Sequence, residues 1–202
     1  MVTVAAAPAG VGARLDGDFF ARPVGDVAVD LLGCVLTVGG VGGMIVETER
    51  YQQDDPASHS FRGPRGRAAV MFGPPGHMYV YRSYGLHWCA NLVCEPEGSG
   101  AAVLIRALAP LHGIPRMRAR RRGVGDPLLC AGPGRLCAAL GIDRHLDGAD
   151  ALRPGGLVAL SGRAEPVEVV CGPRIGITKA ADRPWRFGVA GSPYLSRPFP
   201  RR

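Results

Sequence analysis

The stretch MYVYRSYGLHWCANLV, residues 78–93, constrains the fold more than any other part of the sequence. The stretch reads as two strands around a tight turn at Tyr84-Gly85, with Tyr79, Tyr81 and Ser83 on one face of the first strand. The segment AAVLIRALAP predicts a further strand. CVLTV and MIVETERY, separated by the glycine-rich turn GGVGG, predict a second hairpin. We therefore expect a largely antiparallel sheet.

Helical patterns occur between these strand patterns. Apolar residues between positions 23 and 32 form one broad face of a helix. The basic segment 115–122 and the run after Gly-Pro-Gly at 132–134 each predict a shorter helix. EPVEVVCGPRIGI, residues 165–177, predicts two more strands, and a Pro- and Arg-rich loop is expected over 180–202.

Length and composition fit one domain. The chain has 202 residues, of which 47% are apolar, enough to bury a core, and the charged fraction of 20% excludes a disordered protein. We predict an α+β fold: a single mixed domain over residues 15–202, in which a curved, largely antiparallel β-sheet is flanked by helices and one β-hairpin protrudes. Residues 1–14 are expected to form a flexible tail.

The charge of the chain favours a polyanionic partner. The net charge is +7 and the isoelectric point is about 9.5, as is common for proteins that bind nucleic acid. Lys179 is the only lysine among the 24 basic residues. GC-rich coding, which replaces lysine by arginine, is an equal alternative cause of this bias.

The six cysteines lack the spacing of a zinc site. No C-x-x-C pair occurs, and most lie in apolar runs such as LLGCVL, where a thiol acts as a small buried hydrophobe. The N-terminus lacks the basic and apolar regions of a signal peptide, and no apolar run has the length of a membrane span. We expect a reduced, cytoplasmic protein with no metal, cofactor or membrane partner.

Two charged residues on separate predicted strands are candidates for catalysis. Glu49 lies on an apolar strand and could act as a general base on a water molecule. The alternative is a carboxylate that faces solvent or pairs with an arginine. Arg106 ends an apolar strand pattern, and a buried arginine needs an anionic partner, which a glutamate on a neighbouring strand would supply.

Aromatic residues predict a flat-walled pocket and an exposed tip. Tyr51, His59 and Tyr81 could together hold a flipped base by stacking, although a single histidine more often has a structural role. Tyr84 and Leu86 place apolar side chains at a surface turn, which is typical of a wedge that unstacks a base step. Packing of this tip against its own domain is the alternative.

The segment 116–122 carries five arginines that could contact phosphates or be solvated, and these two interpretations have equal weight. Gly-Pro-Gly at 132–134 could direct helix amides at a phosphate.

In their order and spacing, several motifs resemble the alkyladenine (3-methyladenine) DNA glycosylase family almost from end to end. They are DLLGCVL, IVETERY, DPASHSFRG, VMFGPPGHMYVYRSYGLHWCANLV, AAVLIRALAP, GPGRLCAALGID, PRIGITKAADRPWRF and GSPYLS. The resemblance implies a repair enzyme that flips alkylated or deaminated purines out of duplex DNA and hydrolyses the N-glycosidic bond, leaving an abasic site. It leaves open whether the lesion is 3-methyladenine, 7-methylguanine, hypoxanthine or ethenoadenine.

The resemblance also implies roles for matching residues. Glu49 would deprotonate the attacking water, and Arg106 would fix both. The residues that would hold or select the base are Tyr51, His59, Tyr81 and Asn91. Asn91 would discriminate against guanine through its exocyclic amino group.

Five further residues would contact the DNA. Tyr84 would fill the gap left in the duplex, and Leu86 would assist from the same intercalating hairpin. Arg65, Arg67 and Arg135 would contact phosphates. Many relatives have Thr-Pro-Arg-Asn where this chain has Arg-Gly-Arg-Ala at 65–68, so only Arg67 matches and Arg65 could rebuild the lost contact.

Glycosylases that also cut the DNA backbone commonly use an amine to form a Schiff base. The amines available are Lys179 and the N-terminal amine, and neither lies in the motifs expected to form the pocket, so we predict a monofunctional enzyme. It is expected to act as a monomer on double-stranded DNA containing damaged purines, associated with the nucleoid in a bacterium. The alternatives are a catalytically silent nucleic-acid-binding module on the same fold, a formyl-group-handling domain, and resistance to a DNA-alkylating natural product.

Overall fold

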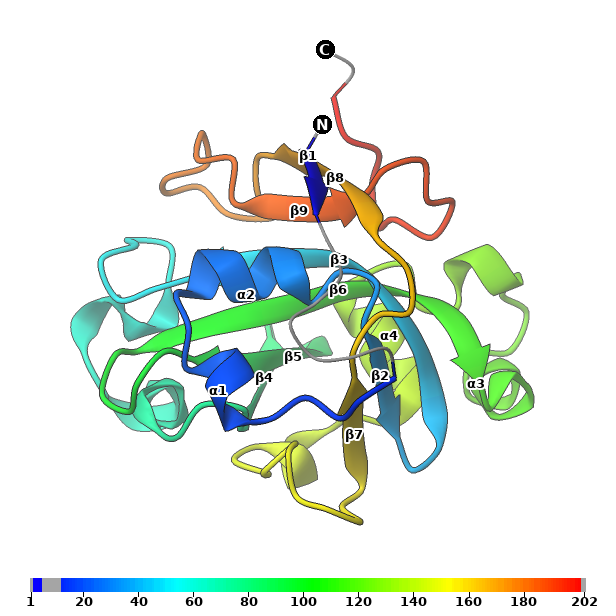
Figure 1. Cartoon of the computed structure of the whole chain (residues 1–202), viewed down its shortest axis with the longest axis horizontal. Helices are drawn as coiled ribbons and strands as arrows, with labels where there is room; N and C mark the ends of the chain where they lie inside the picture. The colour runs from blue at the N-terminus through cyan, green and yellow to red at the C-terminus, as the bar shows by residue number, and fades with distance from the viewer. Residues whose placement is uncertain (1, 5–11, 201–202) are drawn as a thin grey trace.

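The computed structural model describes residues 2–4 and 12–200, and Figure 1 shows their arrangement. Within this described part, nine strands form one sheet in which neighbouring strands are antiparallel. The strands are β1 (Val2–Val4), β2 (Val35–Val38), β3 (Val41–Tyr51), β4 (Met78–Ser83), β5 (His87–Cys94), β6 (Ala101–His112), β7 (Val158–Ser161), β8 (Val167–Gly172) and β9 (Arg186–Val189).

The helices are short and lie between the strands in sequence. The α-helices are α1 (Gly17–Phe20), α2 (Val24–Asp30), α3 (Ile114–Arg120) and α4 (Pro133–Leu140). The 3₁₀ helices span His59–Arg62, Gly66–Phe72, Asp126–Leu128 and Arg144–Leu146. An α+β domain with a curved, largely antiparallel sheet was predicted from the sequence, and this prediction is confirmed.

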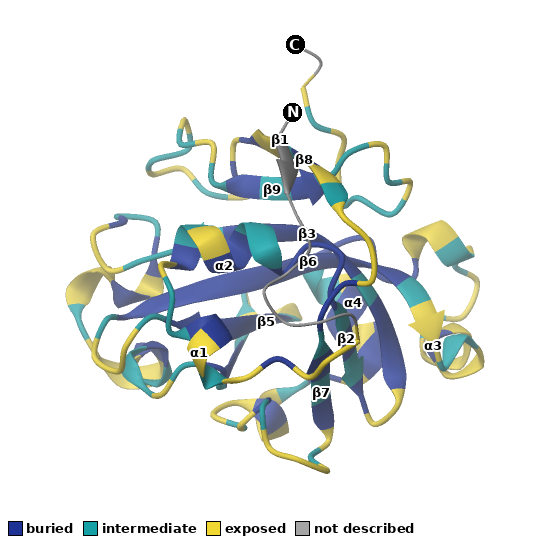
Figure 2. Ribbon diagram, in the orientation of Figure 1, coloured by how far each residue is buried: buried dark blue, intermediate teal, exposed yellow. Residues whose placement is uncertain are grey.

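The long strands β3 and β6 lie at the centre of the sheet. Its order is β1-β8-β9-β3-β6-β5-β4, and β2 pairs with both β3 and β7. Figure 2 shows that β3 and β6 are buried along most of their length. Central strands that are covered on both faces give rigid positions to any side chains they carry.

The two faces of the sheet bury different clusters. On β5, Leu92 joins the main core, which also contains residues of α1, α2 and α4. The next residue, Val93, points to the opposite face and joins a smaller cluster with Met71 and Tyr79. The partly buried rings of Tyr51 and Tyr81 pack against this second cluster, so its face of the sheet carries the aromatic residues.

A β-bulge interrupts the pairing of β3 with β6 near Glu47. The register shifts between Ile45 and Glu47 and again between Glu47 and Thr48. On the face of the sheet that packs against α2, the Thr48 hydroxyl donates to the Ala28 carbonyl at 2.8 Å. A bulge redirects side chains and is common beside active sites.

The C-terminal third differs from the sequence-based prediction. We predicted two strands within residues 165–177, but only β8 lies there; residues 173–177 form no strand, and β9 lies within the part of 180–202 that we predicted as loop. Strand β7 was not predicted. Val2–Val4, at the start of the expected 1–14 tail, pairs with β8, and residues 1 and 5–11 of that tail lie outside the described residues.

Within the described residues, no helix is long and apolar enough to cross a bilayer, and no group of three or more His, Cys, Asp or Glu side chains could hold a metal ion. All six cysteines are free thiols; Cys171 is exposed and the other five are buried.

Candidate active site

A cleft of about 960 Å³ lies over strands β3 to β6, and loops from both halves of the chain line its sides. Eight residues that the sequence singled out line it: Tyr51, His59, Arg67, Tyr81, Tyr84, Asn91, Arg106 and Arg135. The other three do not form part of its lining. Glu49 is buried behind the wall, and Arg65 and Leu86 are exposed beyond it.

Glu49 has no exposed surface and accepts three polar contacts within β3 and its neighbours. Its Oε1 lies 3.2 Å from Nη1 of Arg106 and accepts a hydrogen bond from the Ile175 amide at 2.8 Å. Its Oε2 accepts a hydrogen bond from the Tyr51 hydroxyl at 2.8 Å. All three donor residues line the cleft, so the carboxylate lies directly behind its wall. The ion pair expected between Arg106 and a glutamate on a neighbouring strand is present.

Burial raises the pKa of Glu49 above its ordinary value, and the charge of Arg106 and the donors from Ile175 and Tyr51 oppose this rise. A buried carboxylate with a raised pKa binds a proton more strongly than an exposed one. This property suits a general base, whose pKa must approach the working pH.

Arg106 is shared between two glutamates. Its Nε donates to Oε1 of Glu47 at 3.1 Å, while its Nη1 faces Glu49. Its Nη2 donates to the Ser196 hydroxyl at 3.3 Å. Because a guanidinium is planar and these three contacts use all its nitrogens, the position of Arg106 is fixed.

Glu47 is a buried part of the site that sequence reasoning did not select. Its carboxylate accepts hydrogen bonds from Arg106, from Arg186 at 3.0 Å, and from both the amide and the hydroxyl of Ser196 at 2.6 and 2.8 Å. The available signal was the two-residue spacing of Glu47 and Glu49, which puts both side chains on one face of a strand.

His59 lies between Tyr79 and Arg67 at the cleft wall. Its Nδ1 is 2.8 Å from the Tyr79 hydroxyl and its Nε2 is 3.3 Å from Nη2 of Arg67. Arginine only donates, so Nε2 accepts and Nδ1 carries the hydrogen. Burial and the charge of Arg67 lower the pKa of His59, which keeps the ring neutral.

The rings of the aromatic wall contact one another. Tyr81 meets His59 edge to face, with centroids 4.5 Å apart, and stacks on Tyr79 at 5.3 Å. Asn91 is buried beside them and donates to the Tyr79 carbonyl at 2.9 Å, which fixes the orientation of its amide. The structure therefore brings Tyr81 and His59 into contact, as the sequence indicated, places Asn91 in the same cleft lining, and adds Tyr79.

The β4–β5 hairpin ends in an exposed apolar tip at the mouth of the cleft. Tyr84 is 84% exposed and Leu86 is 79% exposed. The alternative that this tip packs against its own domain is therefore wrong. Tyr84 has a φ of 49° and Gly85 one of 69°, as in a type I′ turn, which ordinarily takes Asn-Gly.

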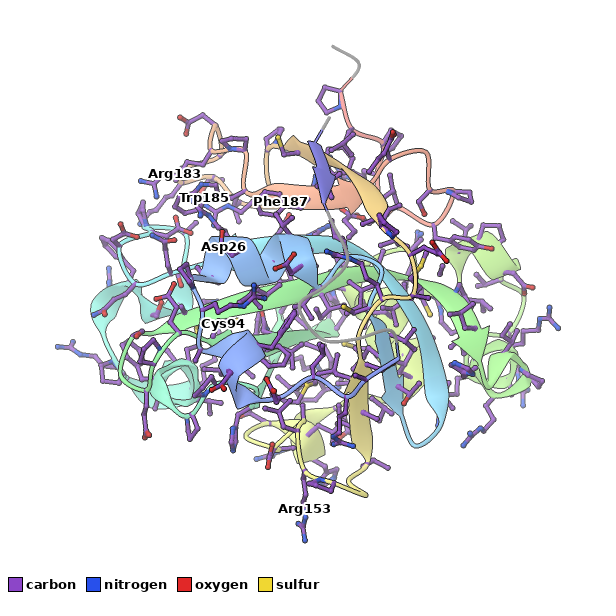
Figure 3. All side chains as sticks on the ribbon, viewed as in Figure 1. Asp26, Cys94, Arg153, Arg183, Trp185 and Phe187 are labelled. Carbon is purple, nitrogen blue, oxygen red and sulfur yellow. The ribbon has the colours of Figure 1, made fainter. Side chains whose placement is uncertain are left out.

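Tyr51 is supported from behind by a buried ion pair that the sequence did not reveal. Arg174 donates to both oxygens of Asp55, with Nη2 3.0 Å from Oδ1, and its guanidinium lies 4.7 Å from the Tyr51 ring. Trp185 continues this stack, because Arg174 and Arg183 lie 5.0 and 4.5 Å from its ring. Figure 3 shows Trp185 and Arg183 side by side.

Comparison with known proteins gives the family. Residues 18–193 match the family model described as methylpurine-DNA glycosylase. The chain belongs to the methylpurine-DNA glycosylase family. A relative from Nitrosospira multiformis is 61% identical over 183 residues, covering 90% of this chain and 93% of the relative. One from Nitrobacter winogradskyi is 58% identical over 193 residues, covering 95% and 91%. Both are named as 3-methyladenine DNA glycosylases. The protein is accordingly a DNA glycosylase, a hydrolase of N-glycosyl bonds.

Basic side chains surround the cleft of this glycosylase. Those in its lining, besides Arg106, are Arg67, Arg82, Arg135, Lys179 and Arg197. The sequence-based premise that Lys179 lies away from the pocket is therefore wrong, because the loop that carries the Ile175 amide also places this exposed lysine in the cleft. The prediction of a monofunctional enzyme had rested on that premise and stays a prediction.

The arginine run of α3 is largely occupied with contacts inside the protein. Arg118 pairs with Asp126 at 2.5 Å, and Arg116 and Arg120 donate to the carbonyls of Gly39 and Ala139 at 3.0 and 2.9 Å. Arg121 donates to the carbonyls of residues 128 and 129. These contacts favour a structural role for most of the run.

Proposed function

We propose that this glycosylase removes alkylated or deaminated purines from double-stranded DNA. In this proposal the purine flips into the cleft and a water activated by Glu49 hydrolyses the N-glycosidic bond, leaving an abasic site. The observation that carries the proposal is the position of Glu49, held by Arg106, Tyr51 and the Ile175 amide directly behind the cleft wall.

The donors around Glu49 support a defined place for the attacking water. A carboxylate has about four lone-pair positions on its two oxygens. Oε1 takes the contacts from Arg106 and Ile175, whereas Oε2 takes only the Tyr51 hydroxyl among the described residues. The remaining position on Oε2 would accept a hydrogen bond from water, orient it and receive its proton as it attacks C1′ of the sugar.

The charge of the carboxylate also matches the reaction. Cleavage of an N-glycosidic bond builds positive charge on the sugar, as in glycoside hydrolysis, and a fixed carboxylate nearby stabilises that charge. Glu49 acts from a position that is buried from bulk solvent, where such stabilisation is stronger than in open water.

The aromatic wall suits a flipped purine. Tyr51 and Tyr81 offer ring faces for stacking, and neutral His59 offers a polar group at the same wall. Alkylation makes a purine electron-poor, which strengthens stacking on electron-rich rings and weakens the glycosidic bond. The amide of Asn91, whose orientation is fixed by its hydrogen bond to the Tyr79 carbonyl, would contact the edge of the base.

The hairpin tip and the basic rim suit duplex DNA. Tyr84 and Leu86 would enter the space left by the flipped nucleotide, and the unstacking of a base step costs a few kcal/mol that such wedges offset. Arg67, Arg135 and Arg197 at the rim would contact phosphates.

The experiment that tests this function is single-turnover incubation with duplexes that each carry one hypoxanthine or one ethenoadenine, beside methylated DNA. We expect release of the free base and strand cleavage only after alkali, the signature of an abasic site. Tight lesion binding without release would instead favour a catalytically silent binding module. Borohydride trapping tests the monofunctional character: a covalent complex through Lys179 would contradict it.

A further inference from the structure

Arg186 connects Glu47 to the two segments that complete the active site. Its Nη1 donates to Oε1 of Glu47 at 3.0 Å, and its Nε donates to the Pro173 carbonyl at 3.1 Å, two residues before the Ile175 amide. Its Nη1 and Nη2 also donate to the carbonyls of Arg197 and Pro198 at 3.1 and 3.2 Å. Arg186 is buried, and in the β3–β9 pairing it lies opposite Glu49.

The buried charges around Glu49 balance only if Arg186 is counted. They are the two carboxylates of Glu47 and Glu49 and the guanidinium groups of Arg106 and Arg186. Glu47 and Glu49 have no exposed surface, and Arg106 contacts both of them. One guanidinium cannot fully compensate two buried carboxylates, and an uncompensated buried carboxylate takes up a proton. Arg186 supplies the second positive charge and directs it at Glu47.

The other titratable groups near Glu49 do not supply this charge. Tyr51 on β3 and Cys89 on β5 are neutral near pH 7, since burial raises the pKa of both. The side chain of Arg174, although close in the loop after β8, forms its ion pair with Asp55. Within the described residues, Glu49 therefore depends on Arg106 as its direct cationic partner.

We propose that Arg186 is a positioning residue that balances the charge of Glu47, so that Arg106 holds Glu49 as the carboxylate that activates water. The inference rests on the proposed function of Glu49. Ser196 assists, because its amide donates a hydrogen bond to Oε2 of Glu47 and its hydroxyl donates one to Oε1. Glu47 is thereby a second positioning residue, one that competes with Glu49 for Arg106 unless its own charge is balanced.

Opposite pH shifts of two variants test this proposal. In Arg186→Gln, Glu47 loses the charge of Arg186 and interacts more strongly with Arg106, which leaves Glu49 less stabilised as a carboxylate. The acid limb of the pH–rate profile for single-turnover base release then moves up by about one pH unit. In Glu47→Gln, the full charge of Arg106 acts on Glu49, and the same limb moves down. Arg186→Lys keeps the charge and leaves the limb in place, as does the control Arg118→Gln, whose partner Asp126 is exposed on α3.

A purely structural role of Arg186 predicts a different result: slower base release at every pH with an unmoved acid limb. Shifts of the acid limb in the same direction in Arg186→Gln and in Glu47→Gln would also overturn the proposal. Thermal unfolding identifies variants that do not fold, and Ser196→Ala then carries the test. It removes one hydroxyl and no charge, and an upward shift is expected because Glu47 depends more on Arg106; no shift would contradict the proposal.

The parallel variant Glu49→Gln separates the two proposals. Base release that survives in Glu49→Gln overturns the proposed function. Loss of release in Glu49→Gln, combined with unmoved acid limbs in the Arg186 and Glu47 variants, overturns only the role of Arg186.

Discussion

The hydroxyl of Tyr51 donates to Oε2 of Glu49 at 2.8 Å, from two residues further along the same strand. A residue that lines the cleft, and that we propose as part of the base pocket, therefore also touches the group that we propose as general base. Burial raises the pKa of Tyr51 far above neutrality, so its hydroxyl stays protonated and remains a donor.

Tyr51→Phe separates these two roles. The ring stays, so lesion binding is retained, while Glu49 loses a hydrogen bond that lowers its pKa. The pKa of Glu49 then rises further, and because base release requires the ionised form, the acid limb of the rate moves to higher pH. At pH values below the pKa of Glu49, we expect the rate of base release to fall about 10-fold, since a hydrogen bond to a charged group contributes about 1.5 kcal/mol.

The measurement is single-turnover base release against pH, with lesion affinity determined in parallel. Tyr194→Phe is the matched control, because Tyr194 packs against the cluster around Val46 and does not line the cleft. A Tyr51→Phe enzyme with an unmoved acid limb would show that this hydrogen bond does not tune Glu49.

Tyr84→Asn is expected to stabilise the hairpin tip and to lower the activity. A non-glycine residue in the left-handed region costs on the order of 1 kcal/mol, whereas Asn-Gly is favoured in a type I′ turn. We expect the free energy of unfolding to rise by up to about 1 kcal/mol while base release from duplex DNA falls. Denaturant unfolding and single-turnover assays check the two effects.

Leu157→Asn provides the control for Tyr84→Asn, because Leu157 is also exposed, at 60%, but lies outside the cleft lining. Its base release should equal that of the wild type. If Tyr84→Asn released damaged bases at the wild-type rate, the hairpin tip would not be a wedge.

Asp55→Asn breaks the buried ion pair behind Tyr51. Arg174 and Asp55 have fully buried side chains, and removal of one partner leaves the other charge uncompensated. Breaking such a pair costs about 3–5 kcal/mol, so the melting temperature should fall by roughly 10 °C.

The exposed pair Arg118–Asp126 is the matched control for that loss. Its side chains are 58% and 44% exposed, and exposed pairs of this kind contribute little. Asp126→Asn should leave the melting temperature unchanged. Equal melting temperatures for Asp55→Asn and Asp126→Asn would contradict the structural role assigned to Arg174.

Salt dependence tests the basic rim of the cleft. Each phosphate contact releases counterions, so the slope of log affinity against log salt should become shallower by about 0.9 in Arg67→Ala and in Arg135→Ala. Arg118→Ala, whose side chain pairs with Asp126 on α3, should leave the slope unchanged. The measurement is binding of undamaged duplex DNA at several salt concentrations. Slopes that do not change in either rim variant would place the phosphate contacts elsewhere.

The local parts of this fold were predictable from the sequence. The turn at Tyr84-Gly85, the strands on either side of it and the hairpin that leads into β3 all follow from local runs of strand-forming residues and glycine placement over a few residues. The partnership of Arg106 with a strand glutamate was also predictable, because a buried arginine requires an anion.

The non-local parts were not predictable in this way. Residues 173–177 alternate like a strand, yet the Ile175 amide bonds to the Glu49 carboxylate instead of to a neighbouring strand. Conversely, β9 follows a Pro- and Arg-rich segment that has the composition of a loop. Its pairing with β3, and with it the contact of Arg186 with Glu47, depends on residues 139 positions apart in the chain. Local patterns carry no signal for such a contact.

The role of Glu49 is tested most directly by single-turnover base release in Glu49→Gln, with lesion-duplex binding measured on the same preparation. Glutamine keeps the shape of the side chain but cannot accept the proton of water at C1′. We predict that binding is retained and that release falls by about 100-fold or more. Release at the wild-type rate would contradict Glu49 as the general base and move the catalytic centre elsewhere in the cleft.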